Sequence, residues 1–356
     1  MNKCLLCLLT LLCLISCKEK TTTEDTAKSH NSNNLSYATK FAIDGTKLIV
    51  LEPWPGALQS RTYEFETPPK RIVVTSTTHL PYLELLGLED KLVGFVGTDY
   101  ITSENINKRL AKGTIKEVGT NGAINLELLL SCQPDVVIVF DMGNESATLD
   151  KISAAGIPII YNADFLENSA LGRAEWIKFF GALFDVSDSA NAIFDQIANR
   201  YNELKSLTDN LIDKPKIFSG VMYGDAWFLP GGQNWSAQFL KDAGGTYIWG
   251  NDATSGWLEV SFEAVLNKAR TADFWIGVAS INSLTELAAQ DLRYTYFEAY
   301  QKGNIFNYNK RLGPHGGFDF FESAYARPDL VLADLIGILH PELLPDHEFY
   351  YFQKLP

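Results

Sequence analysis

Short apolar segments alternate with helix-like segments through most of the chain, and this alternation limits the fold more than any other feature. The predicted strands of the first half cover residues 72–74, 92–96, 136–140 and 159–161. Short strands that are apolar throughout, rather than at every second position, are typical of parallel sheets covered on both faces. The sequence therefore predicts an α/β fold with mainly parallel sheets.

One long amphipathic segment interrupts the alternation near the middle of the chain. Its apolar residues recur at helical spacing: Ala190, Ile193, Phe194, Ile197, Tyr201 and Leu204. The alternation then restarts, with predicted strands at 216–221, 227–229 and 274–278 and a last helix after Pro328. We therefore expect an N-terminal α/β lobe over residues 39–186 and a C-terminal α/β lobe over 211–356. A single helix over residues 187–210 would connect them.

The first residues of the chain indicate the cellular location of the protein. The stretch MNKCLLCLLTLLCLISC has a basic start, an apolar run and a small residue directly before Cys17. It resembles the signal peptide of bacterial lipoproteins, which predicts a signal peptide over residues 1–16 and lipidation of Cys17; an ordinary signal peptide is the alternative. The polar residues 17–38 lack apolar periodicity and predict a disordered tether. The expected location is the bacterial cell envelope, facing the periplasm, on either the inner or the outer membrane.

Composition and cysteine use exclude several classes of protein. The net charge of −13 argues against a nucleic-acid partner, which would require a basic surface. Beyond the signal peptide only Cys17 and Cys132 remain, so an internal disulfide is not expected, and Cys132 is predicted to be a buried, inert thiol. The 7 Trp, 15 Tyr and 21 Phe suit a large core or a cleft for bulky, partly apolar ligands.

Two segments of the chain repeat the same pattern. Asn125-Leu126-Glu127 and Ser261-Phe262-Glu263 each start a helical pattern, and each is followed by an aspartate, Asp135 or Asp273, and an apolar run. A carboxylate near a helix N-terminus is favoured by the helix dipole. The residues alone therefore leave two interpretations of Glu127 and Glu263 open: acids that stabilise helix starts, or a matched pair with a function.

Several short motifs occur in this order: Arg71-Ile72-Val73-Val74, Leu86-Gly87-Leu88, Leu92-Val93-Gly94, Val118-Gly119, Asn125-Leu126-Glu127, Pro134-Asp135, Ala155-Gly156-Ile157-Pro158, Asp242-Ala243-Gly244-Gly245, Val260-Ser261-Phe262-Glu263 and Ala272-Asp273. Together they resemble the motifs of periplasmic substrate-binding proteins of ABC importers for iron–siderophores, haem and vitamin B12. The resemblance covers about residues 70 to 340. It implies two α/β lobes joined by one long helix, with the ligand cleft between the lobes. It also implies that Glu127 and Glu263 dock onto arginines of a permease dimer.

Candidate ligand-binding residues lie where predicted strands end, because open α/β sheets bind ligands at the carboxyl ends of their strands. This rule selects nine residues: Thr77, Asp99, Tyr100, Met142, Tyr223, Trp227, Trp257, Arg311 and His315. Aromatic rings could stack on a catecholate, porphyrin or corrin face, and an arginine could pair with a negatively charged chelate. A histidine could donate a hydrogen bond or act as an axial ligand.

The expected function is capture of a ferric siderophore by a lipid-anchored binding protein, with a corrinoid or haem as the alternative ligands. No catalytic motif and no resident metal or cofactor is expected, and the five histidines form no short metal-ligand pair, which argues against a Mn or Zn binder. A cell-envelope hydrolase is the less favoured alternative. It would need convergent acids in the cleft, for which the sequence offers Asp99, Asp141, Asp225 and Asp319.

Overall fold

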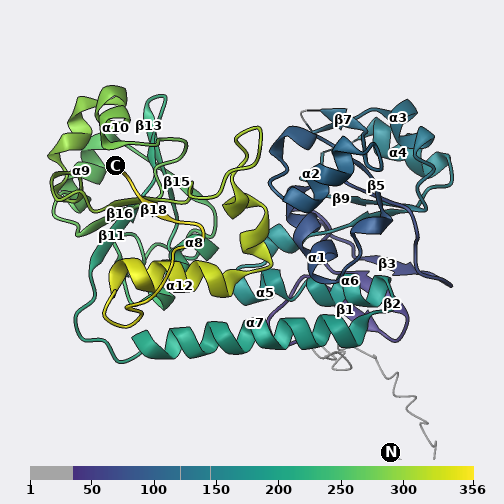
Figure 1. Ribbon diagram of the computed structural model, residues 1–356, viewed down its shortest axis with the longest axis horizontal. Coiled ribbons are helices and arrows are strands. Elements are labelled where there is room, and N and C mark those ends of the chain that lie inside the picture. The colour runs from purple at the N-terminus through teal and green to yellow at the C-terminus, as the bar shows by residue number, and fades with distance from the viewer. Residues whose placement is uncertain (1–34, 121, 145) are drawn as a thin grey trace, which may run out of the picture. The chain divides into compact units, whose positions relative to one another are not determined.

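A five-stranded parallel sheet organises the N-terminal half of the computed structural model, which describes residues 35–120, 122–144 and 146–356 (Figure 1). Its strand order is β10-β9-β4-β5-β6, with β4 (Ile72–Val74), β5 (Leu92–Phe95), β6 (Lys116–Glu117), β9 (Val136–Val139) and β10 (Ile159–Tyr161). The helices between these strands are α1 (Leu80–Leu85), α2 (Glu104–Ala111), α3 (Leu126–Ser131) and α4 (Ala147–Ala154). All four predicted strands of this half are confirmed.

A second five-stranded sheet organises the C-terminal half. Its order is β14-β11-β16-β17-β18, with β11 (Lys216–Ser219), β14 (Thr246–Tyr247), β16 (Phe274–Ile276), β17 (Ile305–Asn307) and β18 (Gln353–Lys354). All neighbours are parallel except the antiparallel pair β17–β18. The helices of this half are α8 (Trp235–Asp242), α9 (Phe262–Ala269), α10 (Leu284–Gln290), α11 (Glu298–Gln301) and α12 (Pro328–Leu339). The predicted α/β class with mainly parallel sheets is therefore confirmed.

Three smaller antiparallel sheets accompany the parallel ones. The first is β1 (Phe41–Asp44), β2 (Lys47–Val50) and β3 (Arg61–Glu64); the second is β12 (Val221–Tyr223), β13 (Ala226–Pro230) and β15 (Trp257–Val260); the third pairs β7 (Gly119–Thr120) with β8 (Ala123–Ile124). The strand predicted over 216–221 is thus two strands, because the left-handed Gly220 (φ 84°) turns the chain out of the parallel sheet. The predicted strand at 227–229 exists, but it lies in the antiparallel sheet.

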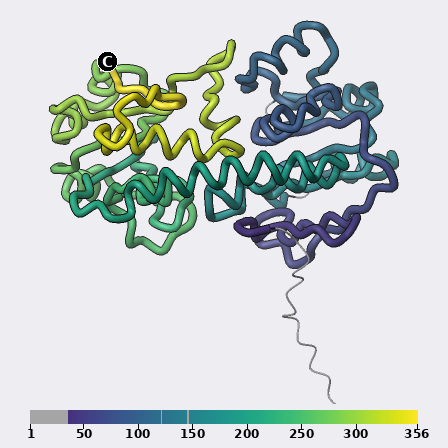
Figure 2. The backbone as a smooth tube through the Cα atoms, turned by 60° about the horizontal axis from the view of Figure 1, so that its bottom comes forward, coloured from purple at the N-terminus to yellow at the C-terminus, as the bar shows by residue number. Residues whose placement is uncertain are grey.

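One helix, α7 (Ser187–Thr208, 22 residues), runs between the two halves, and it begins at the predicted residue. It packs against the preceding α6 (Ile177–Leu183) and, further along, against α12, which lies beside it in Figures 1 and 2. Its buried side chains, such as Phe194 and Tyr201, recur at helical spacing on one face. The Arg200 guanidinium lies 3.7 Å from the Asp329 carboxylate at the start of α12.

The start of the described chain is held by two buried carboxylates. Glu175 accepts hydrogen bonds from the backbone N–H groups of residues 36–38, and Glu167, just before α5 (Ala170–Ala174), accepts those of residues 39 and 40. The tether predicted over 17–38 is therefore wrong for residues 36–38, because the hydrogen bonds to the Glu175 carboxylate fix their backbone. The predicted signal peptide, Cys17 and the rest of the tether lie outside the described residues.

The repeated segments have the same local structure, with α3 in one and α9 in the other. Asn125 and Ser261 are the N-caps, and each side chain accepts a hydrogen bond from the N–H three residues further on. Asp135 and Asp273 each accept a backbone N–H at the start of the neighbouring strand, β4 or β11. The same side chains therefore fix the helix start and the strand start in both sheets, which explains the repetition structurally.

The core is rich in aromatic side chains, and the described part of the chain shows no candidate for a membrane span. Trp176, Trp227 and Trp275 are among the largest fully buried side chains. Cys132 is a buried free thiol, as predicted. Within residues 35–120, 122–144 and 146–356, no helix is long and apolar enough to cross a bilayer.

Candidate ligand-binding cleft

A cavity of about 510 Å³, here called the cleft cavity, is lined by residues of both halves of the chain. Its lining comprises Thr77, Asp99, Tyr100, His315, Gly316, Gly317, Phe318 and Phe321. Four of the nine predicted ligand-binding residues are therefore brought together. Three come from the N-terminal lobe and one from the C-terminal lobe, so a ligand in this cavity would contact both.

The N-terminal residues of the cleft cavity follow two neighbouring parallel strands. Thr77 begins a short 3₁₀ turn directly after β4, and this turn is capped by the Ser76 side chain. Asp99 and Tyr100 lie in a similar turn after β5, entered through the left-handed Gly97. The carboxyl ends of neighbouring parallel strands meet at one edge of a sheet, which is why residues 22 or more positions apart share one site.

The Gly-rich loop 313–317 contacts the N-terminal lobe backbone to backbone. A Cβ on Gly313 would lie 2.7 Å from the Ile101 carbonyl oxygen, and a Cβ on Gly317 would lie 2.5 Å from that of Tyr100. The loop is closed by a hydrogen bond of 2.7 Å from the Gly313 N–H to the Gly317 carbonyl. These glycines therefore permit a close approach between the lobes, and Gly317 also lines the cavity.

The carboxylate of Glu322, which follows this loop in the chain, also joins the lobes. It accepts backbone hydrogen bonds from Thr102 (2.7 Å) and Ser103 (2.9 Å) at the start of α2. Burial raises the pKa of Glu322 to about 7, although the two N–H groups act in the opposite direction. Sequence reasoning missed this residue, because its partners lie 220 and 219 positions away and no local pattern marks them.

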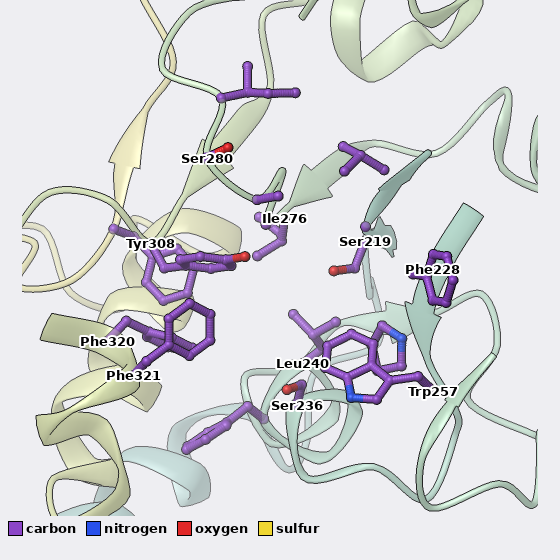
Figure 3. A pocket seen from close by; sticks show the side chains of 18 of the residues that line it. Ser219, Phe228, Ser236, Leu240, Trp257, Ile276, Ser280, Tyr308, Phe320 and Phe321 are labelled. Atoms are coloured by element: carbon purple, nitrogen blue, oxygen red, sulfur yellow. The ribbon is translucent and has the colours of Figure 1, made fainter. Parts of the chain in front are cut away.

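A second cavity of about 650 Å³, here called the C-lobe cavity, lies at the carboxyl ends of β11 and β16 (Figure 3). Figure 3 shows Tyr308, Phe320 and Phe321 on one side and Leu240 and Trp257 on the other. The predicted residues Tyr223 and Trp257 line this cavity and are 81% and 60% exposed. Phe321 lines both cavities, so the two adjoin.

Three predicted residues line neither cavity. The prediction that Trp227 contacts the ligand is wrong, because its side chain is 0% exposed. Trp227 lies in the core, where its indole N–H donates a hydrogen bond to the Ser219 carbonyl. Arg311 is bound to Asp319 (2.7 Å) and lies over the Tyr350 ring, so its charge is already paired. Met142 is exposed on the loop after β9.

The four acids that the hydrolase alternative would need do not converge in the cleft cavity. Asp319 is paired with Arg311, and Asp141 accepts a hydrogen bond from the backbone N–H of Gly143. Asp225 lies in the turn between β12 and β13, which leaves Asp99 as the one of the four that lines the cleft cavity. In the described part of the chain, no group of three or more His, Cys, Asp or Glu side chains could hold a metal ion.

The repeated glutamates are both exposed in the first turn of a short helix. Glu127 lies in α3 and Glu263 in α9, and neither lines a described cavity. The Arg293 guanidinium lies 3.5 Å from the Glu263 carboxylate, but the Glu263 side chain is 76% exposed. Such a surface ion pair contributes little to the stability of the fold, and it leaves the Glu263 carboxylate accessible to a partner.

Two α/β lobes joined by one helix, with a cavity lined from both, define a binding protein that holds its ligand between lobes. The match to the periplasmic binding protein family over residues 72–312 covers more than half of the chain, and the chain belongs to this family. The predicted family and the prediction of a binding protein rather than an enzyme are therefore confirmed.

Individual proteins show the same relationship. An uncharacterized lipoprotein of Methanocaldococcus jannaschii is 26% identical over 81% of this chain and 69% of its own length. A vitamin B12-binding protein of Vibrio campbellii is 24% identical over 56% of this chain and 68% of its own. The crystal structure of a possible iron-binding, periplasmic solute-binding protein from Staphylococcus epidermidis matches 76% of this chain and 99% of its own, with a TM-score of 0.60 and 19% identity.

Proposed function

We propose that the chain is a lipid-anchored substrate-binding protein that captures a ferric siderophore and delivers it to an ABC importer. The observation that carries the proposal is the cleft cavity, because side chains from both lobes line it and a ligand there would hold the lobes together. A corrinoid or haem is the alternative ligand. The similarity to a vitamin B12-binding protein and to an iron-binding protein supports this range of ligands.

Delivery would depend on Glu127 and Glu263. Each is an exposed carboxylate in the first turn of an equivalent helix, one in each lobe. Two matched acids suit a permease dimer that offers one cationic pocket in each subunit, because complementary charges set the register of a complex. The proposed anchor is Cys17, which would hold the protein at the cell envelope on the periplasmic side.

The ligand can be identified by native mass spectrometry of the protein purified from cells grown in complex medium. In parallel, quenching of tryptophan fluorescence is measured with a ferric trihydroxamate, cyanocobalamin and haemin. We expect the ferric trihydroxamate to bind most tightly, and Tyr100→Ala to weaken that binding on the order of tenfold.

Met142→Ala is the matched control, since Met142 is an exposed residue that lines neither cavity. Its affinity should equal that of the unmodified chain. Absence of binding by all three compounds, together with a native mass equal to that of the polypeptide, would contradict the proposed function.

A further inference from the structure

The C-lobe cavity has an unusual lining for a site expected to take metal chelates. Among the described residues that line it, none is Asp, Glu, Lys, Arg or His. Its polar side chains are neutral serines, Gln290 and aromatic hydroxyls such as that of Tyr308. Burial raises the pKa of Tyr308 to about 12, so this residue is also uncharged at neutral pH.

The walls of the cavity belong to the packed core of the lobe. Phe239, Leu335 and Phe352 line it and are almost completely buried, whereas Tyr223 and Trp257 line it and are exposed. The cavity therefore reaches from solvent-exposed aromatic rings to side chains of the interior. A volume of about 650 Å³ lies within the usual range of small-molecule sites.

An anionic group would bind poorly in such a cavity. A buried charge without a counter-ion loses its hydration, which costs several kcal/mol even after relaxation. Burial of a hydrocarbon group, by contrast, is favourable and strengthens binding by about fourfold for each CH₂ group. Because the described lining of the C-lobe cavity carries no charged side chain, it disfavours carboxylates and catecholates. Its apolar side chains favour uncharged alkyl or aryl groups.

We propose that the C-lobe cavity binds an uncharged alkyl or aryl group, and that this group is a substituent of the transported ligand. The second half of the proposal rests on the proposed function. It follows from Phe321, which lines both cavities, so that a ligand with its polar part in the cleft cavity can extend an apolar substituent past this ring. Asp99 and His315 line the cleft cavity, whereas the described lining of the C-lobe cavity includes no acidic residue and no histidine.

The first experiment tests the chemistry of the cavity with a neutral apolar dye, N-phenyl-1-naphthylamine. The protein begins at Lys18 and so retains every residue that the structure describes. Ser236, the second residue of α8, lines the cavity, and Ser236→Asn and Ser236→Asp introduce side chains of similar size that differ in charge. A carboxylate is well tolerated at this position of a helix, so both variants should fold.

We expect dye fluorescence to show binding by the unmodified chain and, within about threefold, by Ser236→Asn, whereas Ser236→Asp binds at least about tenfold more weakly at pH 8. Ser206→Asp is the matched control, since Ser206 is an exposed helical serine of α7 that lines neither cavity. Its affinity should be unchanged. Equal dye affinity of the two Ser236 variants, or no dye binding by the unmodified chain, would overturn the proposal.

The second experiment distinguishes a substituent of the chelate from a free apolar ligand. Binding of ferric acetohydroxamate, ferric octanohydroxamate and n-octanol is measured by tryptophan quenching and calorimetry. We expect the octanohydroxamate complex to bind at least about tenfold more tightly than the acetohydroxamate complex, and Ser236→Asp to remove this difference.

Other outcomes separate the two proposals. Equal affinity for both chelates, unaffected by Ser236→Asp, would overturn the inference and leave the proposed function intact. Binding of n-octanol and the dye without either chelate would support the apolar cavity and show that its ligand is a free apolar molecule; the proposed siderophore would then be excluded.

Discussion

At the scale of single residues, His79 shows how burial without partners affects a side chain. It is 0% exposed, and among the described residues neither ring nitrogen has a hydrogen-bond partner. Burial lowers its pKa to about 3, so the ring is neutral in the folded protein at pH 7. In the unfolded chain the same ring would be protonated below a pH of about 6.5.

This difference predicts a loss of stability in acid. Between pH 6.5 and 3 the unfolded state binds a proton that the folded state does not, so His79 lowers the free energy of unfolding by about 1.4 kcal/mol for each pH unit that the pH falls. His79→Leu should flatten this dependence and stabilise the protein below pH 6. Urea denaturation at several pH values measures it, with the exposed His315→Leu as the control. An identical slope in His79→Leu and the unmodified chain would contradict the interpretation.

Residue type alone was a poor guide to exposure. Trp227 and Trp257 were both predicted to contact the ligand, yet Trp227 is fully buried against Trp275 and Tyr294 while Trp257 is mostly exposed. Thr77, Asp99 and Tyr100 line one cavity, because they follow strands whose ends lie at the same edge of a sheet. The positions of long side chains depend on packing that no local pattern contains.

At the scale of elements, the apolar runs of the sequence predicted the strands well. No local pattern predicted the contacts between the lobes. The β4 and β9 runs are apolar throughout, and both are strands with every residue buried. Glu322 follows two phenylalanines and carries no local signal of its role, yet it accepts the N–H groups of Thr102 and Ser103, directly before α2 of the other lobe. The partners of such a residue are fixed by the tertiary fold.

The raised pKa of Glu322 predicts that the contact between the lobes depends on pH. The groups that face it are the Thr102 and Ser103 N–H groups and the Asp319 carboxylate, whose charge adds to the effect of burial. The folded state binds the proton more tightly than the unfolded state, so stability from this group falls as the pH rises from 4.5 to about 7.

Glu322→Gln should therefore gain stability relative to the unmodified chain over this range, by up to about 1.4 kcal/mol for each pH unit. The measurement is the difference in free energy of unfolding between the two proteins at pH 5, 6 and 7. The exposed Glu66→Gln should show no such trend. A difference that shrinks as the pH rises would contradict the assigned direction.

At the scale of the whole molecule, α7 and the two repeated acids bear on delivery of the ligand. Because α7 is one uninterrupted helix of 22 residues, we expect only small movements of the lobes when a ligand binds. The docking surface would then be largely preformed. Recognition by the permease would depend on the two acids rather than on a large conformational change.

The double variant Glu127→Ala, Glu263→Ala should abolish ligand uptake while leaving ligand affinity unchanged, because both side chains lie outside the two cavities. Uptake of a radiolabelled ferric chelate by cells measures the first effect, and fluorescence quenching measures the second. Glu66→Ala with Glu342→Ala removes two other exposed acids and should leave uptake normal. Normal uptake by the double docking variant, or a loss of its ligand affinity, would exclude the docking role.

The hydrogen bonds of Glu175 and Glu167 to residues 36–40 also limit the reach of the protein if it is anchored at Cys17 as proposed. These bonds begin at residue 36, so 19 residues separate the proposed anchor from the first backbone group that a buried carboxylate holds. Nineteen residues span about 65 Å at full extension. With the proposed anchor, residue 36 would therefore stay within about that distance of the acyl groups, which would make the local concentration of the protein at a neighbouring permease high whatever its total amount in the cell.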